Sequence, residues 1–411
     1  MKSPLNQMTD RADTQPRIVL YSHDTLGYGH LRRNILLSQA LRQCAASPDI
    51  LLIAGMREAG AFALPEGVDA VCLPAYAKNS DGSYAARDLG ASLNSLQKLR
   101  AATIKSAVDA FAPDLMIVDN VPRGAQFELD PTLKALRKKG RTRMILGLRD
   151  VIDDPATVRS QWLRQRNFEA VRDFYSQIWI YGDPALYDTA AEYGISDTPD
   201  CRVSFTGYLN QSGRLGSNAA QAAVGDLIGD DPRPFVMCSV GGGRDGEALC
   251  DAFARSALPP GHRGILLTGS QMSSGARHRI QELAAMRDDL TVVEFVQDPI
   301  AVAARATALI GMGGYNTATE MLSLAPPSLI VPRVRPRQEQ FLRAKRMAER
   351  GLIDMIPPDR LTPEVLETWM ASAFSKASGT TRPLDMGGLD RVRAMADEAM
   401  MDHRDRIRNT A

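Results

Sequence analysis

The segment GMGGYNTATEML, residues 311–322, decides the fold of this chain, because an apolar run leads through glycines into a helical stretch. The run ALIGMGG (308–314) predicts a buried strand that ends at Gly313 and Gly314. Glycines let a backbone approach a ligand closely, and the start of a helix offers free N–H groups to an anion. The segment therefore predicts a strand–turn–helix unit that binds a ligand at the carboxyl edge of a parallel sheet.

The same alternation of strand and helix extends to the amino-terminal side of this segment. Runs of four to six apolar residues closed by Gly, Pro, Asp or Asn predict strands buried on both faces. These runs are 17–22, 50–55, 69–74, 114–120, 143–148, 177–182 and 202–207. Apolar residues at helical spacing lie between them at 30–44, 92–111 and 155–174. Strand–helix alternation predicts a parallel sheet with crossover helices.

The alternation restarts after a polar stretch, so the chain is predicted to form two α/β domains in series. Residues 207–232 are rich in Gly, Asn, Ser and Asp and contain no strong buried run. Six further strands are predicted at 235–243, 264–270, 290–296, 308–314, 328–333 and 352–356. The expected divisions are a disordered leader (1–16), a first domain (17–206), a linker (207–232), a second domain (233–380) and C-terminal helices (381–411) that pack back on the first domain.

Composition excludes several classes of protein. The chain has 411 residues, 44% hydrophobic and 24% charged, which is typical of a globular protein and not of a disordered one. Its 49 Lys and Arg against 48 Asp and Glu give a net charge of +1, so no global field recruits nucleic acid. The five cysteines form no CxxC pair, which argues against a disulfide framework or a thiolate metal site and suits a reducing cytoplasm. No apolar run reaches the roughly 18 residues of a membrane span, and residues 1–16 lack the apolar region of a signal peptide.

The first glycine-rich turn, DTLGYGHLRRN (24–34), follows the first predicted strand. It is not a dinucleotide fingerprint, because Arg32 stands where the third glycine of that motif belongs. His30 lies at the start of a predicted helix, where a neutral imidazole is well placed as a general base. A helix cap explains His30 equally well from this residue alone.

Two later turns carry features that suit a nucleotide. In SVGGGRDGEAL (239–249), Gly241, Gly242 and Gly243 form a backbone nest suited to a diphosphate, and Arg244 adds charge. The alternative is a flexible turn with a solvated arginine. Glu320, about two turns into its helix, could accept hydrogen bonds from a ribose diol. Without context an exposed helix acid is the better interpretation of that residue.

The basic stretch VPRVRPRQEQFLRAKRMAERG (331–351) is typical of a solvated helix face. Glu339 and Gln340 stand at the predicted helix start, where side chains face the cleft of a parallel sheet. There they could hydrogen-bond sugar hydroxyls. A second basic stretch, 134–143, and the pair Arg32–Arg33 lie in the first half. Contact with anionic headgroups is one interpretation of them, and a solvated surface is favoured by the small net charge.

The order GYGHLRR, Thr206–Gly207, GGGRDGE, GGYNTATE and EQFLRA resembles the two-Rossmann-domain glycosyltransferases of the GT-B fold. It is most similar to the group containing the N-acetylglucosaminyltransferase of the peptidoglycan lipid precursor, with a family 28-like C-terminal domain. The resemblance implies two Rossmann-like domains that face each other across a cleft, with the nucleotide sugar on the second domain and the acceptor on the first.

The resemblance also implies roles for individual residues. On the donor side, it places glycines at the phosphates, an acid at the ribose and Glu339–Gln340 at the sugar. The donor residues expected are Gly241, Gly242, Gly243, Arg244, Gly313, Gly314, Asn316, Thr317, Glu320, Glu339 and Gln340. The acceptor side is expected to include Gly27, Gly29, Arg33, Asn120, Arg123, Arg149 and Asp150. His30 is expected close to the chemistry, and Asp119 is the second candidate for the base or for orienting the histidine.

Three departures leave the substrates open. The linker reads Gly207-Tyr208-Leu209-Asn210 where the family has Gly-Asn-Pro with an Arg. Arg343–Ala344 stands where Asn and Ala are usual, which puts the sugar in doubt. The stretches 119–129 and 146–155 do not match the lipid-precursor enzyme, so the acceptor is unknown.

We therefore expect an inverting, metal-independent glycosyltransferase that moves N-acetylglucosamine or a related hexose from a UDP-sugar to an unknown acceptor. No cofactor or metal is expected, since Asp153–Asp154 is not a DxD motif at a strand end. The expected location is the cytoplasm, with peripheral contact at the inner face of the membrane as an open alternative. The oligomeric state is not predicted.

Other functions compete with this expectation. A UDP-sugar hydrolase of the nonulosonic-acid type shares the Gly-x-Gly-His-x-x-Arg loop, here Gly27, Gly29, His30 and Arg33. A non-catalytic nucleotide-sugar-binding protein is a further alternative. A nicotinamide dehydrogenase is disfavoured, because the second predicted strand ends in Ala54-Gly55-Met56-Arg57 without the acidic residue.

Overall fold

The computed structural model describes residues 15–23, 28–56, 59–60, 62–78, 84–196, 198, 201–374 and 384–410, with backbone alone for 402–410. The expected leader therefore lies outside the described residues except for Gln15 and Pro16. Gly27 lies outside them as well.

The first domain is built on a parallel sheet of seven strands in the order β3-β2-β1-β6-β7-β8-β9. The strands are β1 (Arg17–Ser22), β2 (Asp49–Ala54), β3 (Val68–Cys72), β6 (Leu115–Asp119), β7 (Arg143–Arg149), β8 (Gln177–Tyr181) and β9 (Arg202–Phe205). The interior strand β1 pairs in parallel with β2 on one side and with β6 on the other. The strand order reverses between β1 and β6, and ligands of open α/β sheets bind outside the carboxyl ends at such a point.

Helices cover both faces of this sheet. They are α1 (Gly29–Leu41), α2 (Leu93–Phe111), α3 (Asp130–Lys139), α4 (Pro155–Arg164), α5 (Asn167–Phe174) and α6 (Thr189–Tyr193). The spacing predicts one helix over 155–174, but the structure has two, α4 and α5. The break comes at Arg166, whose φ is 54°. The sequence prediction missed the short antiparallel pair β4 (Tyr76–Lys78) and β5 (Tyr84–Ala86) and the 3₁₀ turn η3 (Ala125–Phe127).

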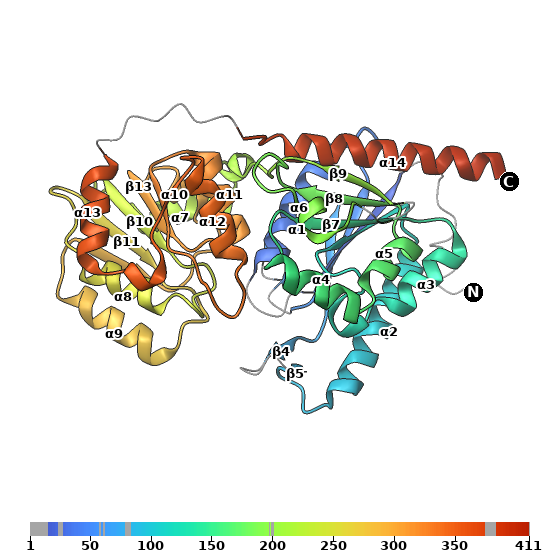
Figure 1. Cartoon of the computed structure of the whole chain (residues 1–411), viewed down its shortest axis with the longest axis horizontal. Helices are drawn as coiled ribbons and strands as arrows, with labels where there is room; N and C mark the ends of the chain where they lie inside the picture. Colours follow the sequence, from blue (N-terminus) through green and yellow to red (C-terminus); the bar gives the residue numbers. More distant parts are fainter. Residues whose placement is uncertain are drawn as a thin grey trace, which may run out of the picture.

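The second domain repeats the design with six parallel strands in the order β12-β11-β10-β13-β14-β15. They are β10 (Phe235–Ser239), β11 (Arg263–Leu267), β12 (Leu290–Val293), β13 (Ala308–Gly311), β14 (Ser328–Ile330) and β15 (Asp354–Met355). The strand order reverses between β10 and β13. The two glycine-rich turns at 241–243 and 313–314 follow the carboxyl ends of these two strands. The predicted fold class, two Rossmann-like α/β domains, is confirmed (Figure 1).

The second domain has its own helices and includes part of the predicted linker. They are α7 (Asn218–Leu227), α8 (Glu247–Arg255), α9 (Ser274–Ala285), α10 (Ile300–Ala303), α11 (Tyr315–Leu324), α12 (Glu339–Glu349) and α13 (Pro363–Ala373), with 3₁₀ turns η4 (Ser212–Arg214) and η5 (Pro358–Arg360). Helix α7 lies within 207–232 and packs on α10. Its buried face consists of Ala220, Ala223 and Leu227, and the small alanines give little hydrophobic signal in the sequence.

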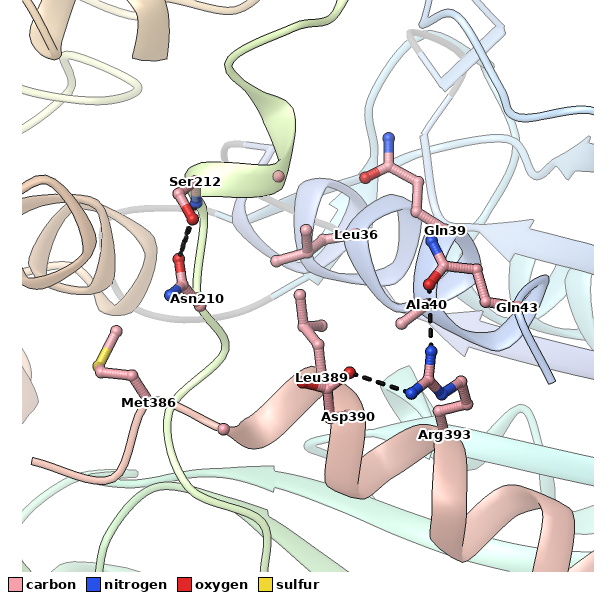
Figure 2. A pocket seen from close by; sticks show the side chains of 12 residues that line it. Leu36, Gln39, Ala40, Gln43, Asn210, Ser212, Met386, Leu389, Asp390 and Arg393 are labelled. Carbon is pink, nitrogen blue, oxygen red and sulfur yellow. Dashed lines mark hydrogen bonds and ion pairs between the residues drawn. The ribbon is translucent and has the colours of Figure 1, made fainter.

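The last helix, α14 (Gly388–Thr410), packs on α1 of the first domain (Figure 1). The amide of Ala45 donates to the Asp397 carboxylate. A cavity of about 460 Å³ lies between three segments. They are the C-terminal half of α1, the segment around Asn210 and Ser212, and the start of α14. Figure 2 shows that Arg393 of α14 reaches across it to Gln43 of α1. In the part of the chain that the structure describes, no helix combines the length and apolarity needed to cross a membrane.

A buried ion pair joins the two domains. Asp150, next after β7, and Arg343, in α12, are each 1% exposed. Arg343 donates to Asp150 from Nε at 3.0 Å and from Nη2 at 2.6 Å, and from Nη1 to the Gly313 carbonyl at 2.8 Å. The Tyr208 hydroxyl donates to the same carboxylate at 2.8 Å. A buried charge that loses its partner is strongly unfavourable, so each of these two residues requires the other in the docked arrangement of the domains.

We predict that Arg343→Met destabilises the protein by about 3–5 kcal/mol, because it leaves Asp150 buried without its cation. The double variant Arg343→Met, Asp150→Leu should recover most of that loss. Chemical unfolding measures both. Lys345→Met in the same helix is the control, since Lys345 is more than half exposed and its ion pair with Glu349 is 3.9 Å long. Additive losses in the double variant would contradict the coupling.

Candidate active site

The carboxyl edges of the two sheets face each other across a cavity of about 270 Å³. Each domain contributes part of its wall. The predicted residues that line it are Gly29, His30, Arg33 and Arg149 from the first domain and Gly241, Gly242, Gly314, Asn316, Thr317, Glu320, Glu339 and Gln340 from the second. The fold thus brings most of the predicted donor residues together with the predicted base.

His30 lines this wall and forms a hydrogen-bonded dyad with the buried Asp119. His30 is the second residue of α1, and Asp119 is the last residue of the neighbouring β6. His30 Nδ1 lies 2.7 Å from Asp119 Oδ2. A carboxylate can only accept, so the bond to Asp119 requires the proton on Nδ1. Arg33 Nη2, which can only donate, also lies 2.9 Å from Nδ1, so this nitrogen cannot satisfy both neighbours at once. In the tautomer that a general base requires, Nδ1 donates to Asp119 and Nε2 keeps its lone pair.

Arg33 fixes the charge of the dyad. One turn after His30 in α1, its Nη2 donates to both carboxylate oxygens of Asp119, at 2.7 and 2.6 Å. Asp119 is 1% exposed, and burial alone would raise its pKa. The positive charge of Arg33 and the hydrogen bonds from His30 and Arg33 instead hold the pKa of Asp119 well below its usual range. The carboxylate is therefore ionised and orients the imidazole.

His23 is a neighbour that sequence reasoning missed. It follows β1 directly, and its ring centroid lies 4.5 Å from that of His30. Burial and the proximity of His30 hold the pKa of His23 well below its usual range. A neutral His23 beside the dyad adds no positive charge to the base. Its only sequence signal is a histidine at the carboxyl end of a central strand.

The glycine-rich turn after β10 divides into two parts. Gly241 and Gly242 line the cavity, as a diphosphate nest would. Gly243 does not line it. Its φ is 92°, and a Cβ there would lie 2.2 Å from the Thr268 carbonyl oxygen, so this glycine is required by the close packing of two turns. Arg244 is exposed and does not line the cavity.

Glu320 projects into the cavity from α11 and is held by Arg214. Arg214 Nη1 donates to Glu320 Oε1 at 2.8 Å, and Arg214 also pairs with Asp298. Arg214 lies in η4, within the predicted linker, and the sequence prediction did not identify it. A single arginine in a polar stretch gives no signal, because its partners are 84 and 106 residues away.

Glu339 and Gln340 begin α12 and are both tied to Arg333. Arg333 Nη2 donates to Glu339, and the backbone amide of Arg333 donates to Gln340 Oε1 at 3.0 Å. Burial opposes ionisation of Glu339, yet the charges of Arg149 and Arg333 lower its pKa. Glu339 Oε2 is buried without a hydrogen-bond partner among the described residues. This oxygen is a free acceptor at the cavity wall.

Arg149 is the cation of the first domain that enters the cavity from β7. Its Nη2 donates to the Ile152 carbonyl at 3.1 Å, and its Nε is buried without a partner in the described part of the chain. Burial lowers the pKa of Arg149 to about 10, and nearby Glu339 partly offsets this. The guanidinium therefore has unused donors facing the cleft.

Besides Asp119, Gly243 and Arg244, four further predicted site residues do not line the cavity. Asp150, expected on the acceptor side, binds Arg343 instead. Gly313, expected on the donor side, accepts from Arg343 and packs against Gln340, where a Cβ would lie 2.9 Å from the backbone oxygen. Arg123 pairs with Asp130 and donates to the Gln165 carbonyl. Asn120 is 7% exposed, with φ 67° at the end of β6. These residues support the site's framework.

Among the described residues, no group of three or more His, Cys, Asp or Glu side chains is arranged to hold a metal ion. The acids around the cavity are instead matched by arginines. Glu294, for example, pairs with Arg277 at 2.7 Å.

The comparisons with known proteins agree on the fold. No family model matches the chain. The UDP-N-acetylglucosamine–N-acetylmuramyl-(pentapeptide) pyrophosphoryl-undecaprenol N-acetylglucosamine transferase of Pasteurella multocida (strain Pm70) is 29% identical over 96 residues, 23% of this chain. The match spans about a quarter (27%) of that relative's length.

Two solved structures are similar over nearly the whole chain. The glycosyltransferase of kitacinnamycin has 16% identity and a TM-score of 0.57, over 95% of this chain and 96% of its own. The UDP-GlcNAc 2-epimerase from Neisseria meningitidis, bound to UDP-GlcNAc, has 11% identity and a TM-score of 0.57, over 94% of this chain and 100% of its own. The chain therefore has the GT-B architecture of two Rossmann-like domains.

The dyad predicts a pH-dependent contribution to stability. In the unfolded chain an aspartate titrates near about 3.9, whereas the pKa of Asp119 in the folded protein lies well below that. The stabilisation is therefore complete at neutral pH and is lost as the pH falls through about 4 toward the folded pKa. The difference in unfolding free energy between wild type and Asp119→Asn should be largest at pH 7 and shrink between about pH 5 and 3. Urea titrations at several pH values measure it.

The exposed pair Arg172–Asp173 provides the control for this measurement. Asp173→Asn should change stability far less than Asp119→Asn does, and without its pH dependence, because solvent screens an exposed pair. An Asp119→Asn difference that stays constant from pH 7 to 3 would show that folding does not shift the pKa of Asp119, and a difference that grows as the pH falls would show that the folded protein holds this carboxyl protonated.

Proposed function

We propose that this protein is a glycosyltransferase that uses a UDP-sugar and inverts the configuration of the transferred sugar. The observation that carries the proposal is the His30–Asp119 dyad, which faces Gly241, Gly242 and Glu320 across one cavity. A base and a diphosphate nest on opposite walls are the two parts that inversion requires. The GT-B architecture supports it, because the glycosyltransferase of kitacinnamycin shares that fold.

In the proposed reaction, His30 Nε2 removes the proton from an acceptor hydroxyl. The acceptor oxygen forms a bond to the anomeric carbon from the face opposite the diphosphate, and the bond from that carbon to the diphosphate oxygen breaks. The proton remains on the imidazolium, which Asp119 stabilises. The leaving UDP is bound by the backbone N–H groups of the turn after β10 and of the start of α11. These groups and the arginines supply the charge stabilisation, so we expect no metal requirement.

The polar side chains that line the cavity suit a nucleotide sugar bound in one orientation. Glu320 would accept from the ribose, while Glu339 and Gln340 would bind the hexose. Glu339 Oε2, buried and unpartnered among the described residues, supports that assignment because a sugar hydroxyl would satisfy it. The Pasteurella relative is named as an N-acetylglucosamine transferase, which supports N-acetylglucosamine or a related hexose as the donor sugar.

A hydrolase with the same donor site is the second candidate. Water could replace the acceptor hydroxyl at His30 without any other change in the dyad. The epimerase from Neisseria meningitidis shares the architecture and is not named a transferase, which supports keeping this alternative. UDP release that requires no added acceptor would favour the hydrolase.

The acceptor is unknown, and the proposed location is the cytoplasm. The relative's name includes a lipid-linked acceptor, so contact with the inner face of a membrane is a proposal. The basic stretch 134–143 gives it little support. It lies at the end of α3 and the start of β7, and therefore at the amino edge of the sheet, opposite the cleft. We propose a solvated surface for that stretch.

We predict that Glu320→Ala weakens UDP binding by about 1.5–3 kcal/mol, roughly 10- to 150-fold in Kd, through the loss of charged hydrogen bonds to the ribose. Isothermal calorimetry with UDP measures this. Glu247→Ala, a half-exposed acid of α8 outside the cavity, is the control for charge. If both variants bind UDP as tightly as wild type, the donor site lies elsewhere.

We predict that His30→Ala lowers the rate of UDP release from a UDP-sugar by about 10²–10⁴-fold, as expected for loss of a general base. UDP affinity should change little. Asp119→Asn should also lower the rate, because an amide can hold the other tautomer of His30. Turnover and melting temperature are measured together. The helix-cap alternative is disfavoured, because the N-cap of α1 is Tyr28 and no side chain caps it. A His30→Ala variant that loses stability but keeps its turnover would give His30 a structural role only.

A further inference from the structure

The first two residues of α11 contact the first domain on both sides of His30. Asn316 Nδ2 donates to the carbonyl of Gly29, the residue before His30, at 2.9 Å. The ring of Tyr315 lies under the guanidinium of Arg33, with 5.3 Å from Cζ to the ring centroid. Gly29 precedes the base, and Arg33 holds its Asp119 partner. The second domain therefore touches both supports of the dyad.

Tyr315 also contacts the ion pair that joins the domains. It is 4% exposed, and Arg343 Cζ lies 5.8 Å from its ring centroid. The ring of Tyr208 stacks on it at 6.2 Å with an interplanar angle of 23°. Tyr315 therefore lies between the cation that neutralises Asp119 and the cation that neutralises Asp150. A separation of the two domains would therefore remove this ring from Arg33.

The same helix carries side chains of the donor wall. Thr317 and Glu320 of α11 line the cavity, and so does Asn316. Asn316 Oδ1 is buried and has no hydrogen-bond partner in the described part of the chain. One end of this amide is fixed on Gly29, and the other end is free to accept from a ligand. Helix α11 thus contacts the nucleotide side and the base side at once.

We propose that Tyr315 and Asn316 are positioning residues that couple docking of the donor domain to the state of the His30–Asp119 dyad. The proposal rests on the proposed function. With Tyr315 in place, Arg33 is stacked and keeps Asp119 neutralised, and Asp119 holds His30 with its proton on Nδ1. Without the ring, Arg33 gains freedom, the neutralisation of Asp119 weakens, and the imidazole is no longer held in one tautomer and position.

The variants Tyr315→Leu and Asn316→Ala test the coupling, and Tyr315→Phe is the conservative partner that retains the ring face. Imidazole ¹⁵N spectra report the tautomer of His30, assigned by comparison with His30→Gln. UDP affinity is measured by calorimetry. The rate of UDP release is measured across pH with a UDP-sugar.

Tyr315→Leu should show mixed Nδ1 and Nε2 tautomers, and the acid limb of its rate–pH profile should move to higher pH. Its kcat should fall about 10- to 100-fold, since small displacements of a reacting group have effects of that size. UDP affinity should stay within about twofold, well below the tenfold that 1.4 kcal/mol produces. Asn316→Ala should show a smaller loss of the same kind, and Tyr315→Phe should restore the wild-type spectrum and profile.

A Tyr315→Leu spectrum and rate–pH profile identical to those of wild type would overturn the proposal, as would a Tyr315→Phe variant equally impaired. If Tyr315→Leu does not fold, Asn316→Ala decides by the same spectrum and profile. The proposed function fails separately, when wild type neither binds UDP nor releases it. The tautomer of His30 in the ligand-free variants still tests the coupling in that case.

Discussion

The buried ion pair between Asp150 and Arg343 is the interaction on which the arrangement of the cleft depends. Both side chains are 1% exposed, and they pair with each other across the boundary between the two domains. Within the docked interface, loss of either partner leaves the other charge buried and uncompensated, which is costly in a protein interior. The pair also fixes its neighbours in sequence. Arg149 precedes Asp150 at the end of β7, and Glu339–Gln340 lie one turn before Arg343 in α12. The contact that docks the domains thus positions groups on both walls.

Charge pairing in the cleft follows from the same constraint. Each acid at the base or the expected ribose and hexose positions is held by an arginine: Asp119 by Arg33, Glu320 by Arg214 and Glu339 by Arg333. These pairs keep carboxylates ionised despite burial, as the lowered pKa of Asp119 and Glu339 indicates. An ionised Asp119 favours the tautomer of His30 with its proton on Nδ1. An imidazole in that state is a base, and its neighbours across the cavity are the N–H groups that suit a diphosphate.

The sequence predicted what local pattern encodes and missed what depends on distant partners. Buried strands followed by glycines located both sheets, and they located Gly241, Gly242 and Glu320 at the cavity. Asp150 was assigned to the wrong role, because its partner Arg343 lies 193 residues away and no spacing rule connects them. Arg343 itself stood out only as a departure from a family pattern. Arg214 and Tyr315 gave no signal for the same reason. Helix α7 was hidden in a polar, alanine-rich stretch.

The most direct test of the central claim is a crystal structure of the protein with a non-hydrolysable UDP-sugar. The account predicts the diphosphate at the backbone of Gly241 and Gly242, the ribose at Glu320, and the anomeric carbon facing a gap beside His30 Nε2 that fits an acceptor hydroxyl. It also predicts that the Asp150–Arg343 pair stays intact. A nucleotide bound outside the cavity between the domains, or an anomeric carbon on the far side of the diphosphate from His30, would contradict it.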